Sequence, residues 1–172
     1  MKECAFSIVR NPFSRTVSMY EYNKRLFESF EHFVRDFHAK CSRVYEVEEE
    51  AKKVKFNYKR TDAGSVYCHV LPMHAYTHKD GKQIVPTIIK QEQLKKLNEL
   101  TETELPAKIR EAISNIPHAN ARKKKKPWQE YYTKETMHLV LDMYKEDFEI
   151  FGYDKEIPNR PDLVDRPRMI TL

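Results

Sequence analysis

The stretch SIVRNPFSRTVSMY near the start of the chain constrains the fold more than any other segment. The apolar run from Ala5 to Val9 is rich in β-forming residues, which indicates a buried strand. Asn11 and Pro12 interrupt this run, and Ser14 is placed to cap a helix from about Arg15 to Phe27. A strand followed at once by a helix predicts an α/β domain whose ligands gather at the carboxyl end of the strand.

The rest of the chain predicts more helix than strand. Apolar periodicity predicts helices over residues 29–39, 91–100 and 105–114. Thr133 is placed to cap a last helix, which we expect to stop at Gly152 and to bury Met137, Val140, Leu141, Tyr144 and Phe148. Strands are expected at Val66–Leu71 and, after the turn HKDGK, at Ile84–Ile89. This balance predicts a helix-rich α/β fold.

The expected domain covers residues 1–153 and carries a charged insertion at about 43–63, which contains EVEEEAKKVK. The last segment, 154–172, is rich in proline, so we expect it to be extended and only partly packed.

Composition limits the kinds of partner. The net charge of +5 suits an anionic ligand, but 26 acidic residues against 31 basic ones do not indicate a coat for nucleic acid. Three cysteines, Cys4, Cys41 and Cys68, form no disulfide framework or CxxC pair, which favours a reducing compartment. The chain has no signal-peptide pattern and no apolar run of about 18 residues, so we expect a cytoplasmic protein without a membrane segment.

Arg10 and Ser18 are the candidates for binding a ligand. Arg10 follows the strand, and Ser18 is expected one turn into the helix. A guanidinium can bind two phosphate oxygens, and a hydroxyl at a helix start can donate to a third. The alternative is a surface arginine beside a helical serine without any ligand.

The stretch Val9 to Tyr20 resembles the pattern V-R-[DN]-P-[FY]-x-R-x-x-S-x-Y of the carbohydrate (Golgi-type) sulfotransferases and their bacterial relatives, which use 3′-phosphoadenosine 5′-phosphosulfate (PAPS). Later segments are also similar, in the family's order: FESFEHFVRDF, LPMHAYTHKDGKQIVPTIIKQEQL and HANARKKKKPWQEYYTKETMHLVLDMYKEDFEIFGY. Pro72, Tyr76, Lys90, Glu92 and Leu94 match the second of these, whereas Met73 stands where the family often has Gln.

The resemblance implies a three-layer, P-loop-like fold and a role for several cations. Arg10 and Ser18 would bind the 3′-phosphate of PAPS, and Arg15 would either be structural or face the nucleotide. The basic run from Arg122 through Lys123 and Lys124 to Lys126 would contact the cofactor or an acidic acceptor, or else be a solvated loop.

The sequence departs from the family at its start. The family binds the 5′-phosphosulfate with a P-K-x-[GA]-[ST]-[ST] segment, and many members place the catalytic base between this segment and the arginine. No such segment occurs here, and nine residues precede Arg10. We therefore expect the first strand, the phosphosulfate loop and the base to be missing, and no catalytic residue is assigned.

The resemblance thus implies transfer of a sulfuryl group from PAPS to a glycan or other hydroxyl acceptor, without a metal. The alternatives are a non-catalytic module that binds a nucleotide or an anionic glycan, and one half of a split enzyme completed by an N-terminal chain. If an N-terminal anchor is missing from this sequence, the expected location is the Golgi lumen instead of the cytoplasm. Neither nucleic acid nor a metal site at His69, His74 and His78 is expected, since Pro72 interrupts any helix that would align the last two.

Overall fold

The computed structural model describes residues 5–39, 71–99, 105–115 and 126–164. The chain divides into two compact units, each built from two stretches of sequence. The strand unit comprises Met1–Asn11 and Met73–Lys126, and the helical unit comprises Pro12–Pro72 and Pro127–Leu172. The expected insertion at 43–63 lies outside the described residues, and so does the expected strand Val66–Leu71 except for its last residue, which forms a bend.

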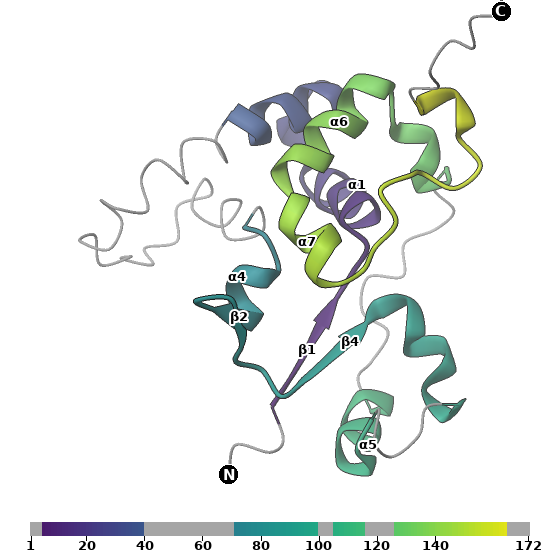
Figure 1. Cartoon of the computed structure of the whole chain (residues 1–172). Coiled ribbons are helices and arrows are strands. Elements are labelled where there is room, and N and C mark those ends of the chain that lie inside the picture. Colours follow the sequence, from purple (N-terminus) through teal and green to yellow (C-terminus); the bar gives the residue numbers. More distant parts are fainter. Residues whose placement is uncertain (1–4, 40–70, 100–104, 116–125, 165–172) are drawn as a thin grey trace, which may run out of the picture. The chain divides into compact units, whose positions relative to one another are not determined.

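The strand unit contains a parallel pair of strands, β1 (Phe6–Val9) and β4 (Thr87–Lys90), which run side by side in Figure 1. The register aligns Phe6 with Thr87 and Val9 with Lys90, so both strands end at the same level. The strand expected from the apolar run is confirmed. The second expected strand begins three residues later than predicted, because Pro86 cannot donate to a ladder and the pairing starts just after it.

A tight hairpin precedes β4. The short helix α4 (His74–Thr77) leads into β2 (His78–Lys79), which pairs with β3 (Lys82–Gln83). Asp80 and Gly81 have φ values of 51° and 71°, which is the conformation of a two-residue type I′ turn. The predicted turn HKDGK is therefore confirmed as a hairpin.

Two helical segments follow β4 in the strand unit. The first, η2 (Gln91–Glu99), is a 3₁₀ segment kinked at Lys96, and the second, α5 (Ala107–Ser114), follows Pro106. A small core joins the end of β4 to α5, with Ile89, Leu105, Ile109 and Ile113 buried together. Both helices were predicted, and the first differs in being a 3₁₀ helix.

The helical unit begins with α1 (Pro12–Asn23) and η1 (Lys24–Leu26), followed by a helix whose described part is residues 30–39. The predicted cap at Ser14 is wrong: the helix begins at Pro12, and Ser14 is buried inside its first turn. Proline favours this position because its φ is already helical and it has no N–H to leave unpaired. Ser29 does cap the next helix, since its hydroxyl accepts from the N–H of His32 at 3.0 Å.

The second part of this unit contains η3 (Trp128–Tyr131), α6 (Lys134–Met143), α7 (Lys145–Ile150) and η4 (Pro161–Leu163). Thr133 caps α6 through a reciprocal capping box with Thr136, as predicted for the cap. The single long helix expected here is divided at Tyr144, and Gly152 follows α7 with φ 59°. In the described part of the tail, Ile157 and Leu163 are buried in the core.

Aromatic side chains dominate the core of the helical unit. Phe13 of α1 packs against Tyr132 and Phe148 with ring centroids 5.2 and 4.9 Å apart, and Phe33 lies 4.2 Å from Phe37. The predicted inward face is confirmed, with Met137, Val140, Tyr144 and Phe148 buried and Leu141 half-buried. This core fixes α1, the helix that follows the candidate ligand-binding loop.

The chain therefore has a mixed, helix-rich α/β fold with a small parallel sheet, as the sequence predicted. Within the described ranges, no helix combines the length and apolar character needed to cross a membrane.

Candidate functional site

The candidate site lies where the two parallel strands end. Arg10 and Asn11 directly follow β1, and Gln91 and Glu92 directly follow β4. Because the strands are parallel and Val9 is aligned with Lys90, these residues meet at one edge of the sheet. The carboxyl edge of a parallel sheet is where α/β folds usually bind ligands.

Two side chains of the strand unit hold the backbone of this loop. The N–H of Arg10 donates to the sulfur of Met73 at 3.3 Å. The N–H of Asn11 donates to the carboxylate of Glu92 at 2.9 Å. Sequence reasoning matched Glu92 to the family pattern without a role and saw Met73 as a departure. Only the tertiary structure shows that both contact the loop, since Met73 is 63 residues from Arg10 in the sequence and Glu92 is 81 residues from Asn11.

Ser18 belongs to α1 in the helical unit, whereas Arg10 belongs to the strand unit. The helix starts at Pro12, so Ser18 is its seventh residue and lies in the second turn rather than the first. Its side chain is exposed. Its backbone N–H is too far into the helix to be one of the four unpaired donors, and only its hydroxyl could contact a phosphate.

Arg15 makes contacts within the helical unit. Its guanidinium donates to the carbonyl oxygen of Leu71 at 2.8 Å and lies over the ring of Tyr144, 5.4 Å from the centroid. A guanidinium held by a carbonyl and an aromatic face is typical of a structural arginine. Of the two roles that the sequence left open for Arg15, these contacts favour the structural one.

The basic residues Arg122, Lys123 and Lys124 lie outside the described residues. The described chain resumes at Lys126, which is exposed, and continues into η3. Trp128, the one tryptophan of the chain, follows two residues later and stacks on Phe13 with ring planes 10° apart. The fluorescence of this single tryptophan therefore reports on the packing at the start of α1.

Of the histidines considered for a metal site, His78 shares a hydrogen bond of 2.9 Å with the hydroxyl of Thr77. His69 lies outside the described residues. In the part of the chain that the structure describes, no three His, Cys, Asp or Glu side chains gather in a geometry suited to a metal ion.

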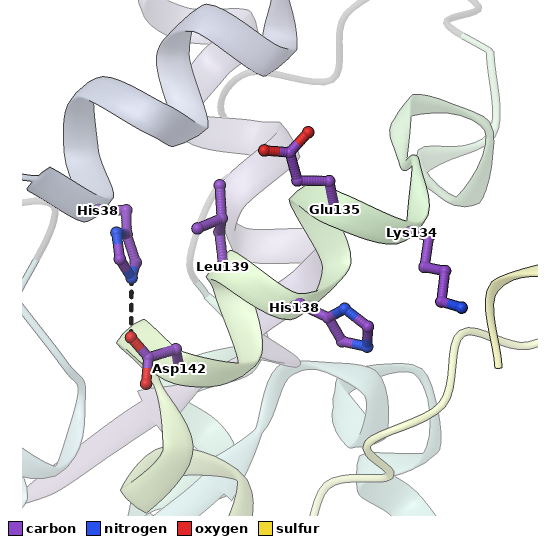
Figure 2. A pocket seen from close by; sticks show the side chains of 6 residues that line it. All are labelled: His38, Lys134, Glu135, His138, Leu139 and Asp142. Carbon is purple, nitrogen blue, oxygen red and sulfur yellow. Dashed lines mark hydrogen bonds and ion pairs between the residues drawn. The ribbon is translucent and has the colours of Figure 1, made fainter. Parts of the chain in front are cut away.

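An open hollow on the helical unit lies beside α6 (Figure 2). Its lining contains none of the residues predicted from the sequence and consists of His38, Lys134, Glu135, His138, Leu139 and Asp142. Two side-chain pairs join helix 30–39 to α6 here: His38 and Asp142 share a hydrogen bond of 2.7 Å, and Arg35 forms an ion pair with the carboxylate of Glu135 at 2.6 Å. These pairs give the hollow a structural role as a seam between two helices.

Two tyrosines beside α1 have pKa values above the ordinary value for tyrosine. Burial and the hydrogen bond that its hydroxyl donates to Glu21, at 2.8 Å, raise the pKa of Tyr131 to about 12. Burial also raises the pKa of Tyr132 well above its usual value, and the Tyr132 hydroxyl donates to the carbonyl of Phe13 at 2.8 Å. Both phenols stay protonated at neutral pH and fasten α1 to the segment around η3.

The comparisons with known proteins agree with the motif analysis. A model of the sulfotransferase family matches residues 2–154, which is most of the chain. Neither a curated protein nor a solved structure matches the chain. The family match covers the strand β1, the loop with Arg10, helix α1 and the helices α6 and α7. The chain therefore belongs to the sulfotransferase family.

Proposed function

We propose that this protein transfers a sulfuryl group from PAPS to a hydroxyl group of a carbohydrate, and that Arg10 and Ser18 bind the 3′-phosphate of the cofactor. The observation that carries the proposal is the strand–loop–helix segment. Arg10 stands at the carboxyl end of a parallel strand, and α1 begins two residues later at Pro12. On the same family relationship we assign the sheet to a P-loop-like fold.

The chemistry assigned to this chain is binding and orientation. A guanidinium offers two parallel N–H donors to a phosphate, and a serine hydroxyl adds a third donor. Together they would set the position of the nucleotide, so that the sulfuryl group faces the acceptor in line. Arg122, Lys123 and Lys124 are proposed as further contacts with the cofactor phosphates or with an acidic acceptor.

Calorimetry tests the phosphate site directly. The ligand is 3′-phosphoadenosine 5′-phosphate, which carries the 3′-phosphate without the reactive sulfuryl group. Arg10→Ala should weaken binding by about 2–4 kcal/mol, the usual loss when one partner of a buried charge pair is removed. Arg25→Ala, at an exposed arginine of η1, is the matched control and should leave the affinity unchanged. Equal affinities for the wild type and Arg10→Ala would show that Arg10 is not the phosphate ligand.

One observation favours the alternative in which the chain binds the nucleotide without completing the transfer alone. Among the described residues the parallel sheet has two strands, and Ile8 in the middle of β1 is 38% exposed. Parallel sheets are normally covered on both faces, and in the split enzyme an element of another chain would cover this one. A sulfate-transfer assay after calorimetry separates the two functions: nucleotide binding without turnover supports the binding module or split enzyme.

A further inference from the structure

We propose that Glu92 is a positioning residue that aims the side chain of Arg10 by holding the loop after β1. This inference rests on the proposed function, because it concerns how the same phosphate site is built. Glu92 is the second residue of η2 and follows β4, the strand that pairs with β1. Its carboxylate accepts from the N–H of Asn11 at 2.9 Å.

The geometry of the peptide unit explains how this contact acts on Arg10. The N–H of Asn11 lies in the same rigid plane as the carbonyl of Arg10, so fixing that N–H fixes ψ of Arg10. The N–H of Arg10 lies in the preceding plane, where the sulfur of Met73 accepts from it at 3.3 Å. Holding this second plane fixes φ. The two contacts therefore fix both dihedral angles at Arg10 and, with them, the direction in which its side chain leaves the backbone.

Because Glu92 is charged, the direction in which nucleotide affinity changes when it is replaced distinguishes two roles. A carboxylate at the edge of a phosphate site repels the ligand, so a purely electrostatic role predicts tighter binding when Glu92 is removed. A positioning role predicts weaker binding, because the loop that carries Arg10 is no longer fixed. The carboxylate is also in the first turn of η2, where a negative charge is favourable.

Glu92→Ala and Glu92→Gln distinguish these roles, because Gln keeps an oxygen acceptor for the N–H of Asn11 and loses the charge. The readout is the ratio of affinities for 3′-phosphoadenosine 5′-phosphate and adenosine 5′-monophosphate, which lacks the 3′-phosphate. Glu92→Ala should lower this ratio about tenfold, as expected for one lost hydrogen bond. Glu92→Gln should keep it within about threefold of the wild type.

Two controls test whether Glu92 affects nucleotide affinity by positioning Arg10. Glu111→Ala removes an exposed glutamate from α5 of the same unit and should leave the ratio unchanged. In an Arg10→Ala background, Glu92→Ala should have no further effect on the ratio, because the side chain that it positions is gone. A higher ratio in Glu92→Ala, an equal loss in Glu92→Gln, or an additive loss in the double variant would each overturn the proposal.

Amide hydrogen exchange of Asn11, measured by NMR without any nucleotide, keeps this inference separate from the proposed function. The N–H of Asn11 should exchange slowly in the wild type and in Glu92→Gln, and faster in Glu92→Ala. If the wild type shows this protection but binds both nucleotides equally, the 3′-phosphate site is refuted while the contact stands. If Asn11 exchanges equally fast in all three proteins, Glu92 does not hold the loop and the positioning role is refuted.

Discussion

Replacing Arg15 tests whether the second arginine of the motif is structural. In the helical unit its guanidinium donates to the carbonyl of Leu71 and lies over the ring of Tyr144. Arg15→Ala removes both contacts, whereas Arg15→Lys keeps the charge but loses the planar fork that fits a carbonyl and an aromatic face together. We expect both variants to destabilise the protein, and the alanine variant to do so more.

The magnitude follows from the two contacts. A hydrogen bond from a charged donor contributes about 1.5–3 kcal/mol, and a cation–π contact contributes about 0.5–2 kcal/mol depending on how far it is removed from water. Arg15 is partly buried, so values near the lower ends apply. Arg15→Ala should therefore lower the free energy of unfolding by about 2–3 kcal/mol, with about half of that loss in Arg15→Lys.

Urea unfolding followed by the fluorescence of Trp128 measures this loss, since Trp128 is the one tryptophan and packs on Phe13 in the same unit. Arg25→Ala, at an exposed position, is the control and should change the midpoint little. Nucleotide affinity is measured at low denaturant, where all variants are folded. Unchanged stability together with a loss of nucleotide affinity in Arg15→Ala would refute the structural role and place Arg15 at the phosphate.

Two further predictions concern the tyrosines beside α1. Tyr132→Phe removes the donor to the buried carbonyl of Phe13 and should lower the free energy of unfolding by about 1 kcal/mol, measured by urea unfolding, with no change expected if the carbonyl finds another donor. Because the pKa of Tyr131 is raised to about 12, its contribution is present below pH 10 and lost as the pH rises from about 10 to 12. Tyr131→Phe should flatten part of the fall in stability between about pH 10 and 12, whereas Tyr22→Phe, at a side chain that is 68% exposed, should leave that fall unchanged.

Most of the secondary structure was predicted from local patterns in the sequence. The spacing of Phe30, Phe33 and Phe37 predicted a helix, and the structure buries these three side chains. The capping preference of Thr133 located the start of α6 to the residue. Such features depend on interactions within a few residues of the chain, which is why a single sequence contains them.

The errors arose where two local preferences compete or where distant residues decide. Ser14 and Pro12 both favour a helix start, and the helix begins at the proline, with Phe13 and Ser14 buried within its first turn. The helix after Thr133 was predicted as continuous, yet the backbone changes at Tyr144, whose ring is fully buried. Packing of this kind is set by segments more than 100 residues apart, and periodicity does not contain it.

The same limit explains which part of the site was predicted. Arg10 could be proposed as a site residue because a cation after a strand and before a helix is a local pattern. Glu92 could not be given a role, because its contact with Asn11 depends on the register that aligns β1 with β4. Register is a property of two strands together, so one strand alone does not determine it.

The anchoring of this loop also separates it from a glycine-rich phosphate loop. In a P-loop, successive backbone N–H groups point at the ligand, and glycines allow that conformation. Here the segment from Ser7 to Tyr20 contains no glycine, and the N–H groups of Arg10 and Asn11 donate to Met73 and Glu92. On the proposed function, recognition of the phosphate at this edge would therefore depend on the side chain of Arg10. It follows that the identity and orientation of that side chain, on a loop whose backbone contacts Met73 and Glu92, would decide the affinity for the 3′-phosphate.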